Sequence, residues 1–514
     1  MRKLIAVAIA VVGIAGCYND PTDPKTWIKQ LGDPRDSKEA VRQLVKLKDR
    51  QAVGPLIELY KHSHDSEQLK AIASFDDPAS VPTLIDSLDY TEDSFDDASI
   101  AATALGEIGD KSAVDPLMKA LVKQLPVKTR ANVVKLEAMK ALAKIKDPRA
   151  VEALIKVLST PSEEQDLFLN QKAAIYLGQF ADPKAVPALV RGLFMSGSGA
   201  TAGANIYQQC RTALIAIGEP SVDKLVETMQ RKNLDVEVDA KKYNFFPGIV
   251  VQKSTVLLGD IRSKKAVPAM IEELGKPDEG LKAPPGQGVS GHQSLIVALG
   301  QISGPDVEKP LLAVLIDPKR HTKERSAAAE ALNLVGDPSA LPVLLKVAQG
   351  KFINGTTIDP EAGAVVASAA TAYSRLADDS AANITFQKVP EEIADMAEVF
   401  KNAATRLQLA KDCKKDLACF AKALNDKDGI KAEKAAIMLA RMGKPGLIEL
   451  SKAVGAQDLS VRLVVLAGID HNGDKSSVEC IAALNKQIEH DEGKSGDLKH
   501  MVDEMRAVKA QLTH

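Results

Sequence analysis

One motif recurs along most of this 514-residue chain. It is a short apolar stretch, often introduced by Asp-Pro, and its copies begin at Ala52, Asp76, Gly109, Lys146, Ala181, Gly218, Ser263, Ser303 and Gly336. The equivalent Val or Leu positions of successive copies are 28 to 45 residues apart. A second apolar-periodic stretch precedes each copy, for example residues 98–109 and 325–336. This spacing predicts a stack of repeated helix pairs rather than several globular domains.

Glycine and proline predict where the helices of each pair begin and end. Gly109 and Gly336 follow a first helix, where glycine tolerates the left-handed conformation that commonly ends helices. The Asp-Pro pair at 77–78 then predicts a turn. A second proline, such as Pro82 or Pro342, fits only the first turn of a helix, so we expect the second helix to begin there.

The Asp-Pro-x-Ala-Val-Pro-x-Leu core of this motif resembles the HEAT repeat, in particular the short variety also found in phycobilin-lyase-like proteins. The resemblance implies an all-α, right-handed α-solenoid of about 11–13 HEAT-like helix pairs. It is clear over residues 35–350 and fades over 351–412, where we expect an irregular helical segment. Residues 413–514 return to HEAT-like repeats. Their last helix places Met501, Met505 and Leu512 on one apolar face, as a terminal cap requires.

The N-terminus is typical of an export signal. Arg2 and Lys3 precede a short apolar run over residues 4–15. The following Ile-Ala-Gly-Cys, which ends at Cys17, resembles the bacterial lipobox. The resemblance implies removal of residues 1–16 as a lipoprotein signal peptide and lipidation of the Cys17 sulfur, with residues 17–34 as a tether. The alternative for residues 4–15 is an ordinary buried helix or strand.

The export signal and the lipobox-like sequence together imply a lipid-anchored protein of the bacterial cell envelope. Tyr18 follows the cysteine, so the aspartate that signals inner-membrane retention in some bacteria is absent. We therefore expect the outer membrane, with the protein facing the periplasm. No later stretch reaches the roughly 18 apolar residues of a spanning helix. The 66 Lys and Arg residues against 68 Asp and Glu residues leave no basic excess, which argues against nucleic-acid partners.

Four further cysteines remain, and Cys413 and Cys419 are the only close pair. On one continuous helix their Cα atoms would lie about 9 Å apart, too far for a disulfide. A helix break at Lys414–Asp416, with Asp416 as N-cap, would allow the bond; the alternative is two separate buried thiols. Cys210 and Cys480 stand among apolar residues at helical spacing, which predicts inert core positions.

No catalytic, metal-binding or cofactor-binding motif is present. His62 and His64 are the only neighbouring histidines, and they match no ligand spacing of a zinc site. No phosphate-binding loop or nucleophile elbow occurs. Segments 195–205, 230–248 and 275–291 lengthen the repeats, and we expect loops there, either slack connections or partner-binding edges.

Taken together, these patterns favour a lipid-anchored envelope scaffold or adaptor. We expect it to bind protein or peptide partners through its helical-repeat surface, without catalysis and without a cofactor or metal. The alternative is an envelope enzyme or a small-ligand binder, with a lyase-like site assembled between repeats.

Overall fold

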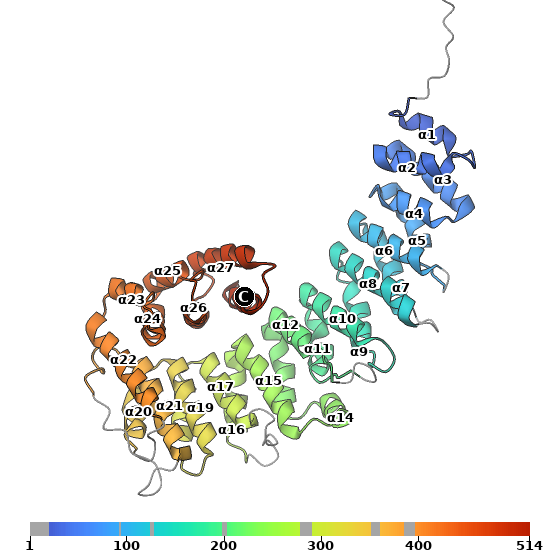
Figure 1. Ribbon diagram of the computed structural model, residues 1–514. Coiled ribbons are helices and arrows are strands. Elements are labelled where there is room, and N and C mark those ends of the chain that lie inside the picture. Colours follow the sequence, from blue (N-terminus) through green and yellow to red (C-terminus); the bar gives the residue numbers. More distant parts are fainter. Residues whose placement is uncertain are drawn as a thin grey trace, which may run out of the picture. The chain divides into compact units, whose positions relative to one another are not determined.

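The computed structural model describes residues 20–91, 94–123, 128–197, 203–277, 290–350, 360–384 and 396–513 (Figure 1). These residues form 28 α-helices, and the only β pairing among them is an isolated bridge between Ser196 and Asn205. The predicted all-α repeat fold is therefore confirmed. Within these ranges, no helix has both the length and the apolar character needed to cross a membrane.

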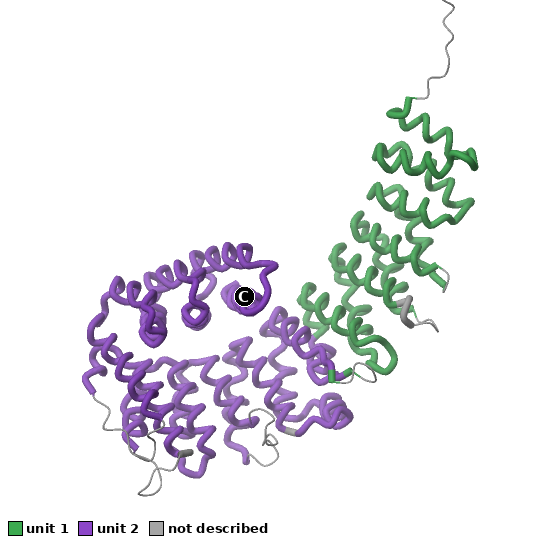
Figure 2. The backbone as a smooth tube through the Cα atoms, in the orientation of Figure 1, with its two compact units in different colours: residues 1–185, 197–203 green, residues 186–196, 204–514 purple. Residues whose placement is uncertain are grey.

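The chain divides into two compact units (Figure 2). Unit 1 comprises Met1–Ala185 with Gly197–Gly203, and unit 2 comprises Val186–Ser196 with Ala204–His514. The division falls between Ala185 and Val186, inside the expected array 35–350, and the segment Gly197–Gly203 belongs with unit 1. Unit 1 contains α1 Pro24–Gln30, α2 Ser37–Leu47, α3 Val53–Ser63, α4 Ser66–Ala73, α5 Val81–Asp86, α6 Phe95–Ile108, α7 Val114–Val122, α8 Lys128–Ile145, α9 Ala150–Ser159 and α10 Leu167–Phe180.

Unit 2 holds the remaining helices. They are α11 Val186–Gly192, α12 Tyr207–Ile217, α13 Val222–Met229, α14 Leu234–Lys242, α15 Pro247–Ile261, α16 Val267–Leu274, α17 Gly291–Ile302, α18 Glu308–Ile316, α19 Thr322–Val335, α20 Leu341–Ala348, α21 Pro360–Leu376, α22 Ala397–Cys413, α23 Leu417–Ala423, α24 Gly429–Arg441, α25 Lys444–Lys452, α26 Leu459–Asn472, α27 Val478–Asp491 and α28 Asp497–Thr513. First helices of successive pairs pack on one another, as α15, α17, α19 and α21 do, and second helices such as α16, α18 and α20 pack behind them.

The turn between the two helices of a pair follows the predicted chemistry. The Asp77 carboxylate accepts a hydrogen bond from the Ala79 backbone N–H at 2.9 Å. A 3-10 turn over Pro78–Ser80 follows, and α5 begins with Pro82 in its first turn. Gly109, with a φ of 77°, adopts the left-handed conformation at the end of α6. At the equivalent position after α10 stands Ala181, whose φ is 50°.

Glycine and alanine allow the first helices to approach closely. A Cβ atom built on Gly106 of α6 would lie 2.7 Å from the Ala141 Cα atom of α8. One built on Gly300 of α17 would lie 2.8 Å from the Ala331 Cα atom of α19. Real side-chain atoms do not approach a backbone this closely, so these positions accept only glycine without rearrangement. The low aromatic content of the chain, 4%, fits a core built from such tight helix contacts.

Helices also form in two segments where the sequence predicted less order. Within the expected tether, Asp23 caps α1, and the Trp27 Nε1–H donates to the Pro21 carbonyl at 2.9 Å. The described part of 351–412 contains α21 and α22, which pack in sequence against α19 and α24. The repeat stack therefore continues through this segment, although the Asp-Pro turn motif is absent from it. Helix packing needs the apolar stripe of each helix and not the turn motif.

Polar side chains satisfy the last carbonyl groups of α21. The Lys434 Nζ group is fully buried and donates to the carbonyls of Arg375 at 2.8 Å and Ala377 at 2.6 Å. The Arg441 guanidinium donates to the Leu376 carbonyl at 2.7 Å. Burial, reinforced by the neighbouring arginine charges, lowers the pKa of Lys434 to about 7.

The C-terminal helices return to the middle of unit 2. The cap helix α28 buries Met501, Met505 and Leu512, as predicted. Its Gln511 side chain donates to the Asp260 carbonyl near the end of α15. The Arg262 guanidinium, at the C-cap of α15, bonds both the carboxylate and the carbonyl of Asp470 in α26. We call these contacts the α15 latch; they join residues more than 200 positions apart.

Candidate functional site

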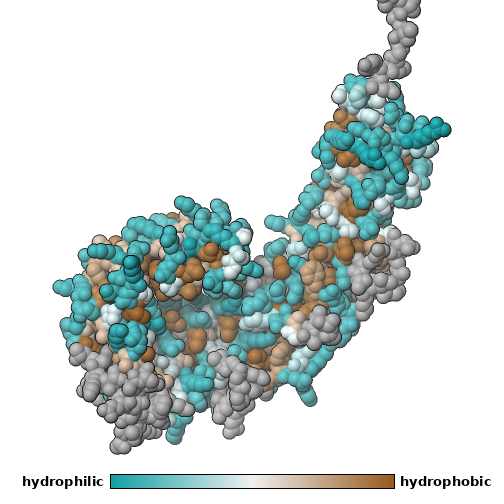
Figure 3. Space-filling model, in the orientation of Figure 1, coloured by the Kyte–Doolittle hydropathy of each residue, from teal (hydrophilic) through white to brown (hydrophobic). Residues whose placement is uncertain are grey.

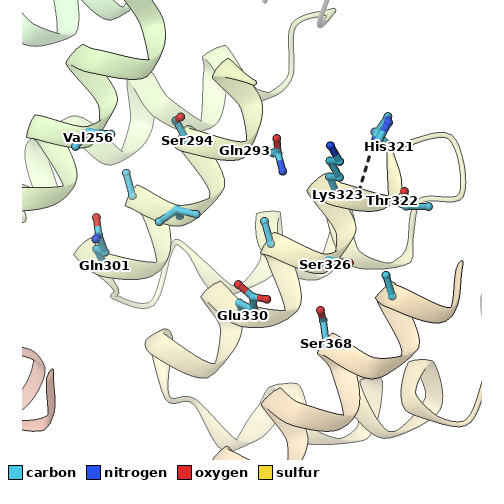
Figure 4. A pocket seen from close by; sticks show the side chains of 14 residues that line it. Val256, Gln293, Ser294, Gln301, His321, Thr322, Lys323, Ser326, Glu330 and Ser368 are labelled. Atoms are coloured by element: carbon cyan, nitrogen blue, oxygen red, sulfur yellow. Dashed lines mark hydrogen bonds between the residues drawn. The ribbon is translucent and has the colours of Figure 1, made fainter. Parts of the chain in front are cut away.

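A pocket of about 690 Å³ lies over four consecutive first helices of unit 2, α15, α17, α19 and α21 (Figure 4). We call it the first-helix pocket. Hydrophobic residues gather along the hollowed face of unit 2 that contains these helices (Figure 3). Concave, mainly apolar pockets of this size with a few polar groups are typical of ligand-binding sites.

The middle of the pocket is apolar. Each helix contributes small aliphatic side chains: Val256 from α15, Val297 and Ala298 from α17, Ala327 from α19 and Ala364 from α21. Val297 is 41% exposed. These side chains present a strip of apolar surface that water covers in the free protein, and a ligand that displaces this water would gain the hydrophobic free energy.

Polar side chains stand at the two ends of this strip. Gln293 and Gln301 lie at opposite ends of its α17 edge, and Lys323 and Glu330 do so on α19 (Figure 4). Lys323 and Glu330 are both exposed. Within the described parts of the chain, neither of these two side chains forms an ion pair or hydrogen bond. The pocket therefore offers one cation, one anion and two amides around an apolar floor.

Helix caps hold one polar end of the pocket in place. A capping box joins Ser290 and Gln293, whose two reciprocal hydrogen bonds are each 3.1 Å long. The Nδ1 atom of His321 accepts a hydrogen bond from the Lys323 backbone N–H at 3.1 Å and so caps α19. These bonds satisfy N–H groups that helix starts leave open, and they fix the positions of Gln293 and Lys323.

A buried polar cluster supports the same end from below. The Arg320 guanidinium lies 3.0 Å from the Nδ1 atom of His292, 3.2 Å from a Glu324 carboxylate oxygen and 2.7 Å from the Leu274 carbonyl. Burial raises the pKa of Glu324, but the hydrogen bond with His292 and the charge of Arg320 outweigh it and lower this pKa overall. The cluster thus ties α16, α17 and α19 together beneath the pocket.

A second side chain that could be reactive is the buried amine of Lys253. Its Nζ atom lies 4.7 to 5.1 Å from the ring centres of Phe194, Tyr207 and Phe245 and donates to the Leu193 carbonyl at 2.7 Å. Burial lowers the pKa of Lys253 to about 8. Three aromatic rings and a carbonyl surround this amine, and its contacts join α12 and α15 to the segment after α11. We therefore assign Lys253 a structural role.

The cysteines fall into three groups. Cys17 lies outside the residues that the structure describes. Cys413 and Cys419 form a disulfide bond with Cα atoms 5.3 Å apart, at the break between α22 and α23. The Asp416 side chain caps α23 there, accepting from the N–H groups of residues 418 and 419. Cys210 and Cys480 are free and buried, and burial raises the pKa of both thiols.

The other positions considered in the sequence lie away from the pocket. His64 ends α3 in unit 1, with its ring against Tyr60. Among the described residues, no group of three His, Cys, Asp or Glu side chains could hold a metal ion. Segment 230–248 contains the helix α14, so the expectation of a loop there was wrong. Leu234 and Val238 of α14 are exposed. Most of 275–291 falls outside the described residues.

Sequence reasoning missed the first-helix pocket. Its residues differ little in type from those of other exposed helix faces. A usable signal does exist, because Gln293, Val297 and Gln301 recur at four-residue spacing on the face opposite the buried residues of α17.

Comparison with known families identifies the repeats. Residues 91–166 and 124–196 match the family described as HEAT repeats, and residues 324–350 match the PBS lyase HEAT-like repeat. No curated protein sequence matches the chain.

Several solved structures share the helical-repeat arrangement at low identity. One is the complex of CpcE and CpcF of phycocyanin lyase from Nostoc sp. PCC7120, at 18% identity, 64% of this chain, 94% of that chain and a TM-score of 0.25. Another is human deoxyhypusine hydroxylase in complex with glycerol, at 17% identity, 61% of this chain, 96% of that chain and a TM-score of 0.21. Importin beta shows 12% identity, 95% of this chain, 72% of that chain and a TM-score of 0.38. At these TM-scores none of the three supports an argument about function.

Proposed function

We propose that this HEAT-repeat protein is a lipid-anchored scaffold of the bacterial cell envelope that binds protein or peptide partners and performs no catalysis. The observation that carries the proposal is the first-helix pocket. Its apolar strip is exposed, its ends are polar, and its floor is held rigid by caps and a buried cluster. Such a surface can bind a partner without any chemical step.

The proposed anchor is Cys17, with the protein on the outer membrane facing the periplasm. Support comes from the lipobox-like sequence before Cys17 and from the Cys413–Cys419 disulfide, which is a bond that persists in oxidising compartments. Labelling cells with a fatty-acid analogue tests the anchor. The wild-type chain is expected to take up the label and Cys17→Ala to lose it; an unlabelled wild-type chain contradicts lipidation.

Crosslinking at the pocket tests partner binding. A photoreactive amino acid replaces Val297 in the full chain, and a matched variant carries it at Val478, which is also exposed but lies on the second helix α27. We expect the Val297 variant to capture a defined partner in cells and the Val478 variant to capture none. Equal capture at both positions, or none at either, contradicts binding through the pocket.

The second candidate is a small-ligand binder or lyase-like enzyme. The match to the PBS lyase HEAT-like repeat over residues 324–350 favours it, because Ser326, Ala327 and Glu330 of this range line the pocket. Against covalent chemistry through a thiol stand the burial and raised pKa of Cys210 and Cys480. Visible absorption from the purified protein would support a bound bilin, and a featureless spectrum would contradict it.

A further inference from the structure

The two charged residues of the first-helix pocket lie on one helix, at a backbone separation set by helix geometry. Lys323 and Glu330 are seven residues apart on α19, which places them about 10.5 Å apart along the helix axis. Between them the same helix contributes Ala327 to the apolar strip. A ligand that pairs with both charges must therefore be dipolar, must span this distance and must be apolar in between.

An extended peptide meets these requirements. In the polyproline II conformation it advances about 3.1 Å per residue with three residues per turn, so side chains three positions apart face the same side and lie about 9.3 Å apart. An acidic side chain beside Lys323 and a basic side chain beside Glu330 then belong to residues three positions apart. The side chains of the two residues between them project to either side of this line, beside Val297 and Ala327, which favours apolar side chains.

The amides of the neighbouring helix suit a peptide backbone. Gln293 and Gln301 are eight residues apart on α17 and border the same strip. Gln301 carries both donors and an acceptor for peptide C=O and N–H groups, and Gln293, whose Oε1 accepts from the Ser290 N–H, still offers its NH2 donors to a peptide carbonyl. A hydrocarbon ligand would leave Gln301, the NH2 group of Gln293 and both charges without partners, at a cost in free energy.

We propose that the first-helix pocket binds an extended peptide segment in which an acidic and a basic residue, three positions apart, flank two apolar residues. This inference rests on the proposed function of partner binding and specifies the partner's chemistry. The acidic residue can come before or after the basic residue in the peptide sequence. In either case the peptide can bind in the direction that places its acidic side chain beside Lys323 and its basic side chain beside Glu330.

Binding of three labelled peptides to the full chain tests the proposal. They carry Asp-Val-Val-Lys, Asp-Val-Val-Asp or Lys-Val-Val-Lys between Gly-Ser flanks, and fluorescence polarisation reports their affinities. We expect the first peptide to bind about tenfold more tightly than the other two, because each of these places one like charge against the pocket. Equal affinities, or no binding of any peptide below about 1 mM, overturn the proposal.

Charge exchange in the protein gives the sharper test. Lys323→Glu is expected to weaken the binding of Asp-Val-Val-Lys by about tenfold and to make Lys-Val-Val-Lys the most tightly bound peptide. The double variant Lys323→Glu, Glu330→Lys is expected to restore the affinity for Asp-Val-Val-Lys, which then binds in the opposite direction. The control Lys309→Glu, on the exposed side of α18, is expected to change nothing. An unaltered preference in Lys323→Glu overturns the proposal.

The two proposals fail separately. Partner capture at Val297 without discrimination among the peptides refutes the peptide rule and leaves the scaffold function standing. Discrimination among the peptides without capture in cells refutes the scaffold function and leaves the chemistry of the pocket intact.

Discussion

Single residues at the ends of first helices carry part of the stability of each repeat. Gly109 has a positive φ that other residue types adopt only at a cost in free energy, and open space surrounds its Cα atom. Gly54 also faces open space but lies in the first turn of α3, where alanine is favourable. The two glycines of unit 1 therefore separate backbone strain from steric crowding.

We expect Gly109→Ala to lower the free energy of unfolding of unit 1 by about 1 kcal/mol, because alanine is strained at positive φ. Gly54→Ala is expected to leave it unchanged or to raise it by up to about 1 kcal/mol. Chemical denaturation of the two variants measures both effects. A loss of similar size in both would show that strain at Gly109 is not the cause.

The number of free thiols tests two residue-level expectations at once. The full sequence holds five cysteines. If Cys17 carries lipid and Cys413 is bonded to Cys419, the unfolded, unreduced protein purified from membranes exposes only Cys210 and Cys480. Titration with a thiol reagent should thus find two. Three thiols would indicate an unlipidated Cys17 in the chain, and four would indicate lipid at Cys17 without the disulfide.

At the scale of helices, the contact between α21 and α24 makes stability depend on pH. Lys434 has a pKa of about 7 when folded and about 10.4 when unfolded. Between these values the unfolded chain binds a proton that the folded protein does not hold, so stability rises with pH across this window and gains nothing from it below pH 7.

We therefore expect the unfolding free energy of the wild type, relative to Lys434→Met, to increase from pH 7 to pH 9. Urea denaturation at several pH values measures this difference. The control Lys475→Met removes an exposed lysine of the same unit and is expected to show no such slope. A pH-independent difference for Lys434→Met would mean that its buried amine keeps an ordinary pKa.

At the scale of the whole molecule, the repeats could be predicted from the sequence, but the contacts between repeats far apart in the chain could not. Pro82 and Gly109 mark helix ends because their backbone chemistry is local, and the structure places those ends where expected. The stack through α21 and α22 lacks such markers, so it was underestimated. The first-helix pocket was missed for a different reason: it is assembled from four helices, and none of its residues is distinctive alone.

The α15 latch is another feature that local patterns do not reveal. Arg262 and Asp470 are each an ordinary surface residue in the sequence, yet they pair across unit 2. We expect Arg262→Ala to accelerate hydrogen exchange in α26, and in α28 which packs on it, by about tenfold, because it removes the bonds that hold α26 to α15. The control Lys264→Ala, an exposed cation two residues away, is expected to leave exchange unchanged. Unaltered exchange in Arg262→Ala would show that other contacts hold the latch.

The latch also bears on the order in which the protein is assembled during synthesis. A chain that emerges N-terminus first presents Asp260 and Arg262 long before Asp470 and Gln511 exist to meet them. The repeats of unit 1 need only their near neighbours and can form as they appear. The bonds of α15 to α26 and α28 instead wait for the last helices, so a chain truncated before α26 would lack all of them and would be more vulnerable to proteolysis at the end of α15.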